Sequence, residues 1–298
     1  MGDEGYSTDQ RGMLRARLET MHDQLPILGQ AMPQHRLLSS SLCRRLADEL
    51  AVSQRQVQIE ALDLQIIPER YVKNMQSVSL KEQQRLLRSS VSLIGLGGLG
   101  GWILEILARM GVGHIQAVDG DAFVESNLNR QLLCSQETLG LMKAEAAAER
   151  VRGINPSIEL STSQEFLDTD GFAEFLQGSS LAIDALGGLA VRLELKEAAQ
   201  RQGLPVVTGA LAGELGYVST VYPGESGPFA LWTGSSGAEE SLGCPPFVVA
   251  AVASLQCTEA VHILCGRPPS LRGTMAVLDC SSLQWEMFSL AGTDNDGR

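Results

Sequence analysis

Short apolar runs and longer amphipathic segments alternate through the middle of the chain, from about residue 90 to residue 213. Such runs are typical of buried strands, and helical periodicity in the segments between them is typical of helices that cover a sheet. The runs predict strands at 90–95, 115–119, 158–161, 181–185 and 205–209. The intervening segments predict helices at 102–110, 142–152, 171–177 and 189–202. This alternation predicts an α/β fold, a Rossmann-like, mostly parallel sheet with helices on both faces.

The two ends of the chain have different patterns. Residues 1–67 contain few glycines and show helical runs at 13–21 and 37–50, which predict a helical N-terminal extension. After Gly213 the pattern predicts a strand at 217–222, a polar loop at 224–243, a long apolar helix at 247–264 and closing antiparallel strands at 274–279 and 284–289. We therefore divide the chain into an extension, 1–67, a main domain, 68–290, and a polar tail, 291–298.

Within the extension, residues 46–57 resemble a helix-turn-helix, with Ser53 as the N-cap of its second helix. The pattern is compatible with a DNA reader or with a helical cap on the main domain. A recognition helix needs donors for phosphates and base edges, and Arg55 is the only cation that this helix would carry. We therefore favour the cap.

Composition narrows the class of protein. The formal net charge of −12 leaves no basic excess for a nucleic-acid backbone, so we do not expect nucleic acid as a partner. No apolar run approaches the roughly 18–20 residues that span a bilayer, and residues 1–10 are too polar for a signal peptide. We expect a cytoplasmic protein with no membrane partner. The six cysteines are scattered without a Cys-x-x-Cys pair, which favours neither a disulfide framework nor a zinc site.

A glycine-rich segment follows the first predicted strand and opens the next helix. Its glycines are Gly95, Gly97, Gly98 and Gly100. Glycines in this position permit a tight turn and let backbone amides approach a nucleotide phosphate at a helix N-terminus. Asp119 ends the next predicted strand, where a carboxylate can hold ribose hydroxyls. The segment predicts nucleotide binding; the alternative is a glycine turn needed only for packing.

Two cations indicate which nucleotide chemistry follows. A polar cluster after Asp121 consists of Ser126, Asn127, Leu128, Asn129, Arg130 and Gln131, and Lys143 opens the next predicted helix. Adenylate formation needs cations at the α-phosphate and at the departing pyrophosphate, whereas an NAD-dependent oxidoreductase does not. Taken singly, Arg130 could form a surface ion pair, and Lys143 could be a solvated residue at the start of a helix. Together, at this spacing after the glycines, they favour adenylate formation.

These and several further motifs form an ordered set between about residues 68 and 290. The set comprises Arg70-Tyr71, Gly95-Leu-Gly-Gly-Leu-Gly100, Gly111-Val-Gly113, Asp119-Gly-Asp121, Ser126-Asn-Leu-Asn-Arg-Gln131, Lys143, Ile154-Asn-Pro156 and Ser254-Leu-Gln256 with Glu259-Ala260. In this order the motifs resemble the E1-like activating enzymes of the ThiF, MoeB and HesA family.

The resemblance implies a homodimer that binds ATP and Mg²⁺. It would join AMP to the C-terminal carboxylate of a small ubiquitin-like sulfur carrier that ends in Gly-Gly. Asp119 would hold the ribose, and Asn127, Arg130 and Lys143 would hold phosphates. The nucleotide site would also include the glycine-rich segment, Asp121, the cluster at 126–131, Gly187 and Gly188.

The sequence departs from the family pattern in three places. Gly187 stands where the family has a metal-binding Asp, in Ile183-Asp-Ala-Leu-Gly-Gly188. Asp184 or Asp121 would then have to supply the carboxylate, or phosphates and water would hold the metal, or turnover would be lost. Lys73 stands where the family sends an Arg into the partner's site, which keeps the charge but loses the bidentate geometry. Both zinc-binding cysteine pairs are missing, so we expect no zinc.

Cys244 precedes the long apolar helix, near the place where some relatives carry a thioester- or persulfide-forming cysteine. A helix N-terminus can lower the pKa of a thiol. The alternative is an incidental thiol at the end of a loop.

The expected function is adenylation of a ubiquitin-like carrier, with Arg130, Lys143 and Lys73 as catalytic side chains. One alternative is a non-catalytic homologue that binds ATP or the carrier, which Gly187 supports. A second is an NAD-dependent oxidoreductase, and a third is a relative that acts on a tRNA nucleoside carboxylate.

Overall fold

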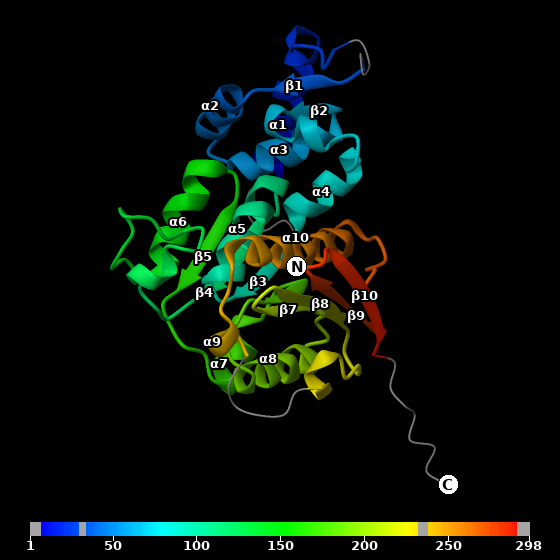
Figure 1. Ribbon diagram of the computed structural model, residues 1–298. Coiled ribbons are helices and arrows are strands. Elements are labelled where there is room, and N and C mark those ends of the chain that lie inside the picture. The colour runs from blue at the N-terminus through cyan, green and yellow to red at the C-terminus, as the bar shows by residue number, and fades with distance from the viewer. Residues whose placement is uncertain (1–6, 30–33, 232–237, 291–298) are drawn as a thin grey trace.

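The structure, a computed structural model, describes residues 7–29, 34–231 and 238–290. The predicted tail at 291–298 lies outside the described residues. Within them, an eight-stranded sheet forms the centre of the molecule, in the order β10-β9-β8-β7-β6-β3-β4-β5 (Figure 1). Its strands are β3 (Ser90–Ile94), β4 (His114–Val118), β5 (Glu159–Ser163), β6 (Leu181–Asp184), β7 (Val206–Ala212), β8 (Leu215–Val221), β9 (Thr274–Asp279) and β10 (Gln284–Ser289).

The sheet is parallel from β5 to β7 and antiparallel from β7 to β10. The chain runs outward from β3 through β4 to β5 and then crosses back to the other side of β3, where it forms β6 and β7. This reversal creates a switch point between β3 and β6, where the loops at the carboxyl ends diverge and leave a crevice. The predicted α/β fold, with its antiparallel C-terminal strands, is confirmed.

Helices cover both faces of the sheet, as the strand–helix alternation predicts. One face carries α5 (Gly98–Met110), α6 (Lys143–Ile154) and α10 (Pro246–Cys265), and the other carries α7 (Thr169–Phe175) and α8 (Ala190–Arg201) (Figure 1). Each face has its own buried apolar cluster, because residues of the buried strands alternate between the two sides.

Helix α10 is long and apolar enough to cross a membrane, by its length and composition alone. A candidate span of this kind was not expected from the sequence. Its apolar run is broken by Gln256 and Glu259, and both side chains are buried with polar partners. Gln256 Nε2 donates to the Asp184 carbonyl at 2.8 Å, and Glu259 Oε2 accepts from Thr220 Oγ1 at 2.8 Å. Because 56% of its most apolar stretch is buried against the rest of the protein, α10 is a core helix of this fold.

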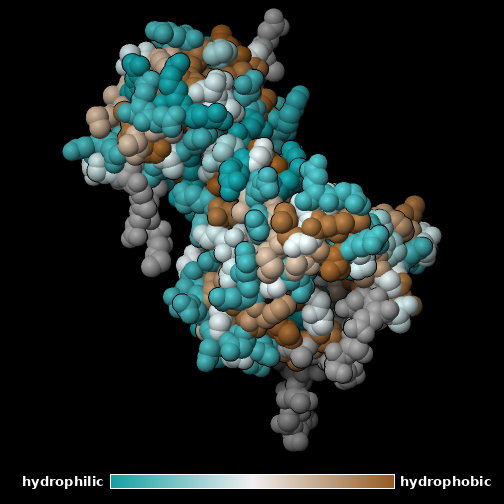
Figure 2. Space-filling view, turned by 90° about the vertical axis from the view of Figure 1, so that its left-hand side faces the viewer, coloured by the Kyte–Doolittle hydropathy of each residue, from teal (hydrophilic) through white to brown (hydrophobic). Residues whose placement is uncertain are grey.

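The N-terminal part combines helices with a small parallel sheet. It contains α1 (Thr8–Met21), α2 (Ser40–Leu50), α3 (Gln54–Asp63), β1 (Arg36–Leu38) and β2 (Ile66–Pro68). Ser7, Ser39 and Ser53 cap the three helices with their side-chain oxygens. The prediction of a helix over 37–50 was wrong at its start, because residues 36–38 pair with β2 and the helix begins at Ser40. Figure 2 shows this part as a separate lobe above the larger sheet domain.

Several short elements were not predicted. They are α4 (Leu80–Arg88), α9 (Glu239–Leu242), and the 3-10 helices at His22–Gln24, Glu69–Asn74, Glu125–Asn127 and Pro228–Leu231. Helix α4 packs against α3 and α10 and so joins the N-terminal lobe to the sheet domain.

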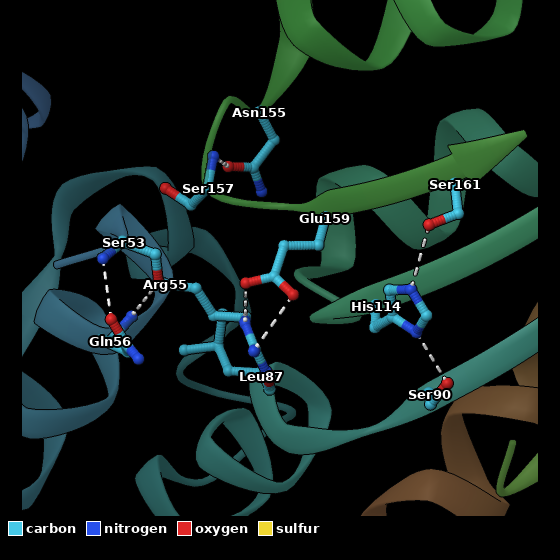
Figure 3. A network of polar contacts seen from close by, with 10 residues as sticks. All are labelled: Ser53, Arg55, Gln56, Leu87, Ser90, His114, Asn155, Ser157, Glu159 and Ser161. Atoms are coloured by element: carbon cyan, nitrogen blue, oxygen red, sulfur yellow. Dashed lines mark hydrogen bonds and ion pairs between the residues drawn. The ribbon is translucent and has the colours of Figure 1, made fainter. Parts of the chain in front are cut away.

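Helix α3 is the second helix of the predicted helix-turn-helix, and its polar side chains form hydrogen bonds and an ion pair with the sheet domain (Figure 3). Arg55 donates from Nε and Nη2 to the two carboxylate oxygens of Glu159, at 3.0 and 3.2 Å. Gln58 Nε2 donates to Ser157 Oγ at 2.6 Å, and every residue from 56 to 62 is buried. Helix α3 thus packs against the sheet domain, which is the arrangement that the cap interpretation predicts.

Candidate nucleotide site

A cavity of about 440 Å³ lies at the carboxyl ends of β3, β4, β5, β6 and β7, at the switch point of the sheet. The glycine loop after β3, the loops after β4, β5 and β6, the end of β7 and the start of α10 all contribute to it. The predicted site residues that line it are Gly95, Gly97, Gly98, Asp119, Asp121, Arg130, Gln131, Lys143, Gly187 and Cys244. One concave surface thus brings together residues from distant parts of the sequence.

The glycine loop is shaped by two positions that exclude a side chain. A Cβ on Gly95, where φ is +96°, would lie 2.5 Å from the Ala185 carbonyl oxygen. A Cβ on Gly100 would lie 1.9 Å from the Gly95 carbonyl oxygen. Helix α5 begins at Gly98 without a side-chain cap, so its first amides and its dipole are available to an anion in the cavity. Gly97 and Gly98 keep that approach open to a phosphate.

Asp119 connects the glycine loop to the loop after β4. Its Oδ2 accepts from the Leu96 amide at 2.8 Å, and its Oδ1 accepts from the Asp121 amide at 2.9 Å. Lys143 is buried at the start of α6; its Nζ lies 2.7 Å from Asp121 Oδ2 and 3.4 Å from Asp119. Two carboxylates therefore fix the position of the Lys143 ammonium beside the cavity.

Arg130 and Gln131 close the same side of the cavity. Arg130 Nη1 donates to the Ser126 carbonyl at 2.8 Å and to Asn129 Oδ1 at 2.9 Å, and the residue is half-buried. The Gln131 side chain is only 7% exposed and lies beneath Gly97, and its Oε1 has no hydrogen-bond partner among the described residues. A buried amide without a partner beside a glycine cradle fits a polar ligand that completes its hydrogen bonds.

Asp184 lies below the cavity and does not line it. Its Oδ1 accepts from the Leu186 amide at 3.1 Å; its Oδ2 accepts from Arg192 Nη1 at 2.8 Å and from Thr208 Oγ1 at 2.6 Å. The carboxylate is fully buried, and both oxygens are engaged. This geometry does not favour the metal role that the sequence analysis allowed for Asp184, because a metal would have to displace Arg192 from a buried pair.

The side chains around the cavity do not form a preformed metal site. Among the described residues, no group of three His, Cys, Asp or Glu side chains is arranged to hold an ion. Asp119 is bound by two amides, and Asp121 is paired with Lys143. Gly187 lines the cavity, and no atom of the described residues lies within 4 Å of where its Cβ would be, so the position at which the resemblance places a metal-binding Asp is open.

Other predicted residues lie outside the cavity. Asn127 is buried and its Oδ1 accepts from the Val124 amide at 3.1 Å, a contact that stabilises the loop. Gly100 and Gly188 shape the loops without lining the cavity, and Lys73 is exposed on the 3-10 helix after β2. The role of Lys73 in a partner's site stays a prediction.

A second, more open hollow adjoins the first. Ser126, Leu128, Asn129 and Glu125 line it together with Gly243, and both hollows share Arg130 and Cys244. Cys244 is therefore placed where the nucleotide cavity meets an open approach from solvent. Part of the predicted polar cluster thus belongs to this approach and not to the cavity itself.

The sequence analysis missed one wall of the cavity. The residues Glu165, Phe166 and Leu167 after β5, together with Phe172, Leu186, Val191 and Arg192, also line it. They carry no motif, and the signal that could have indicated them is topological: every loop at the carboxyl end of a strand near the switch point can contribute to the crevice.

A glycine cradle at a helix N-terminus, a strand-end carboxylate and two cations around a switch-point crevice define the class of nucleotide-dependent α/β enzymes. Sequence comparison identifies the group within that class: the profile of the ThiF family matches residues 70–297, and the chain belongs to that family.

Its relatives include named adenylyltransferases and E1 enzymes. The chain is 31% identical over 219 residues to the SAMP-activating enzyme E1 of Haloferax volcanii, covering 71% of this chain and 80% of the relative. It is 30% identical over 222 residues to the sulfur carrier protein ThiS adenylyltransferase of Escherichia coli, covering 72% and 88%. Together with the family match, these likenesses show that the chain is an adenylyltransferase.

Solved structures confirm the fold. MccB from E. coli, in a complex with AMPCPP and MccA, superposes with a TM-score of 0.64 at 17% identity over 74% of this chain and 71% of MccB. PaaA superposes with a TM-score of 0.62 at 20% identity over 96% of this chain and 83% of PaaA. At these identities the likeness concerns the fold alone.

Proposed function

We propose that this enzyme uses ATP to adenylate the C-terminal carboxylate of a small ubiquitin-like carrier protein. Support comes from one relative that is named a sulfur carrier protein ThiS adenylyltransferase and from another that is named a SAMP-activating enzyme E1. The observation that carries the proposal is the convergence of Gly97, Gly98, Gln131, Arg130 and Lys143 on one crevice. A carboxylate oxygen of the carrier forms a bond to the α-phosphorus, and the bond from that phosphorus to the pyrophosphate oxygen breaks.

The side chains act in this reaction by position and charge, and none of them needs to be a nucleophile. The amides of the glycine loop and Gln131 orient the phosphates, while Arg130 and Lys143 offset the charge that develops on the phosphates. Asp119 holds the loop that carries these amides, and its carboxylate is proposed to hold the ribose. The carrier's tail would approach through the second hollow, because that hollow meets the nucleotide cavity at Arg130 and Cys244.

Pyrophosphate exchange tests the proposal. The full-length protein is incubated with ATP, Mg²⁺, labelled pyrophosphate and small carrier proteins that end in Gly-Gly. We expect label to enter ATP only when a cognate carrier is present, and a carrier shortened by its last glycine serves as the control. Tight binding of NAD without binding of ATP would contradict the proposal and favour an oxidoreductase.

A second candidate function, a homologue that binds without turnover, is favoured by Gly187, a glycine at the position where the resemblance places a metal-binding Asp. The variant Gly187→Asp separates the two. It places a carboxylate at an open position that lines the cavity, and Gly187→Asn matches its size without its charge. If the fold positions ATP for reaction, Gly187→Asp raises exchange or lowers the Mg²⁺ requirement, and Gly187→Asn does neither. If neither variant exchanges while both bind ATP, the binding function is favoured.

A further inference from the structure

The cavity has an apolar side that the proposed chemistry does not use. Ile94, Val118, Leu167, Phe172 and Leu186 all line it, and all belong to or pack against the apolar cluster between the sheet and helices α7 and α8. The polar groups that suit phosphates stand elsewhere: Gly97 and Gly98 at the start of α5, and Lys143 at the start of α6. The helices α5 and α6 cover the opposite face of the sheet. The cavity is therefore divided between a cationic side and an apolar side.

Phe166 stands at the rim of the apolar side. Its side chain is 78% exposed, and it lies in the loop after β5 between Glu165 and Leu167, which also line the cavity. The ring packs over Gly120: a Cβ on that glycine would lie 2.7 Å from two ring carbons. Gly120 separates Asp119 from Asp121, so the ring lies next to the carboxylate proposed to hold the ribose.

We propose that Phe166 is the platform on which the base of the bound nucleotide stacks. The proposal rests on the proposed use of ATP. With phosphates at the cationic side and ribose at Asp119, the base extends toward Phe166 and the apolar wall. A purine has two apolar faces, and an exposed aromatic ring gains contact area and stacking energy when one of them covers it. Phe166 acts as a positioning residue, because it holds the nucleoside while other groups meet the reacting phosphate.

A stacking role has two testable consequences that a purely structural role of Phe166 would not have. The side chain should matter for ligands that carry a base and should not matter for phosphate chains alone. An aromatic replacement should preserve the effect, whereas an aliphatic side chain of similar volume should not. Stacking tolerates any base, so ATP and GTP should lose affinity to a similar extent.

The experiment measures binding to the full-length protein by calorimetry, with ATP, GTP and tripolyphosphate as probes. The variants are Phe166→Ala, Phe166→Leu and Phe166→Tyr. We expect Phe166→Ala to weaken the binding of ATP and GTP by about 5- to 100-fold, which corresponds to the loss of one base–aromatic stack. Phe166→Tyr should bind like the natural protein, Phe166→Leu should resemble Phe166→Ala, and tripolyphosphate should bind all variants equally. In pyrophosphate exchange the KM for ATP should rise while kcat changes little.

A matched control is Phe288→Ala. Phe288 is also an exposed phenylalanine, on β10, at the edge of the sheet opposite β5. Its truncation should leave ATP affinity unchanged. Unaltered ATP binding by Phe166→Ala, equal loss of tripolyphosphate, or full rescue by Phe166→Leu would each overturn the stacking role. Failure of the natural protein to bind ATP would instead overturn the proposed function, and with it this inference, so the two failures are distinguishable.

Discussion

The buried pair of Asp184 and Arg192 offers the sharpest test of how the site is built. Asp184 is fully buried and Arg192 is 4% exposed. Arg192 also donates to the Gly209 carbonyl at 3.1 Å and to the Leu186 carbonyl, so it ties the loop after β6 to β7. We predict that Asp184→Asn destabilises the whole protein, because it removes the buried carboxylate charge that Arg192 Nη1 contacts at 2.8 Å.

The magnitude follows from the burial of both partners. Removal of one member of a buried, hydrogen-bonded ion pair costs about 3–5 kcal/mol. Domains are stable by only about 5–15 kcal/mol, so the loss is a large fraction of the total. Asparagine keeps the volume and can still accept hydrogen bonds, which places the expected loss near the lower figure, at about 3 kcal/mol.

Urea unfolding at pH 7, followed by circular dichroism, measures the loss. The double variant Asp184→Asn with Arg192→Met completes a double-mutant cycle, and we expect it to be less destabilised than the sum of the single variants. Arg201→Met is the matched control on the same helix, because Arg201 forms an exposed i,i+4 pair with Glu197 at 3.7 Å. That exposed pair should contribute less than about 1 kcal/mol.

A different result would support metal binding by Asp184. If Asp184→Asn is as stable as the natural protein, and its only defect is a raised Mg²⁺ requirement in pyrophosphate exchange, the carboxylate serves the metal and not the fold. Burial and hydrogen bonding of Asp184 would then not contribute to the stability of the fold.

Two further predictions concern pH and assembly. The Arg267 hydrogen bond at 2.7 Å lowers the pKa of Glu82 from 4.5 to about 2, so its stabilising contribution is present above about pH 4.5 and lost as the pH falls through about 2. The melting temperatures of the natural protein and Glu82→Gln should therefore differ at neutral pH and converge toward pH 2 in a calorimetric series. We also expect a homodimer in sedimentation at micromolar concentration, since Lys73 lies outside its own chain's cavity; an active monomer would contradict this.

Local motifs made the residues on the cationic side of the cavity predictable from the sequence. The glycine segment, Asp119 and Lys143 each follow a strand or open a helix, and their chemistry depends on that local position. The topology then brings them together, because carboxyl ends of parallel strands share one edge of the sheet. The same reasoning placed the main strands and helices of the sheet domain within a few residues.

The remaining features depend on contacts that sequence patterns do not contain. Asp184 appeared available because its buried partners, Arg192 and Thr208, come from other elements of the fold. Phe166 carries no motif and follows a strand with a mostly exposed pattern. The sequence did not indicate the short strands β1 and β2 in the extension, because these strands are stabilised by pairing with each other across about thirty residues.

The conformation of the loop after β6 explains why a substitution at Gly187 can test metal binding. The strand ends at Asp184, and a sequence argument alone permits the following glycines to bend so that Asp184 faces the nucleotide. The structure fixes a different bend: the Leu186 amide donates to Asp184 and the Leu186 carbonyl accepts from Arg192, so Asp184 stays beneath the loop while residues 185–187 face the cavity. A carboxylate at position 187 would project from that loop into open space. The Gly187→Asp variant can therefore return a metal ligand without disturbing the Asp184–Arg192 pair, and its effect on exchange reports on the metal and not on the fold.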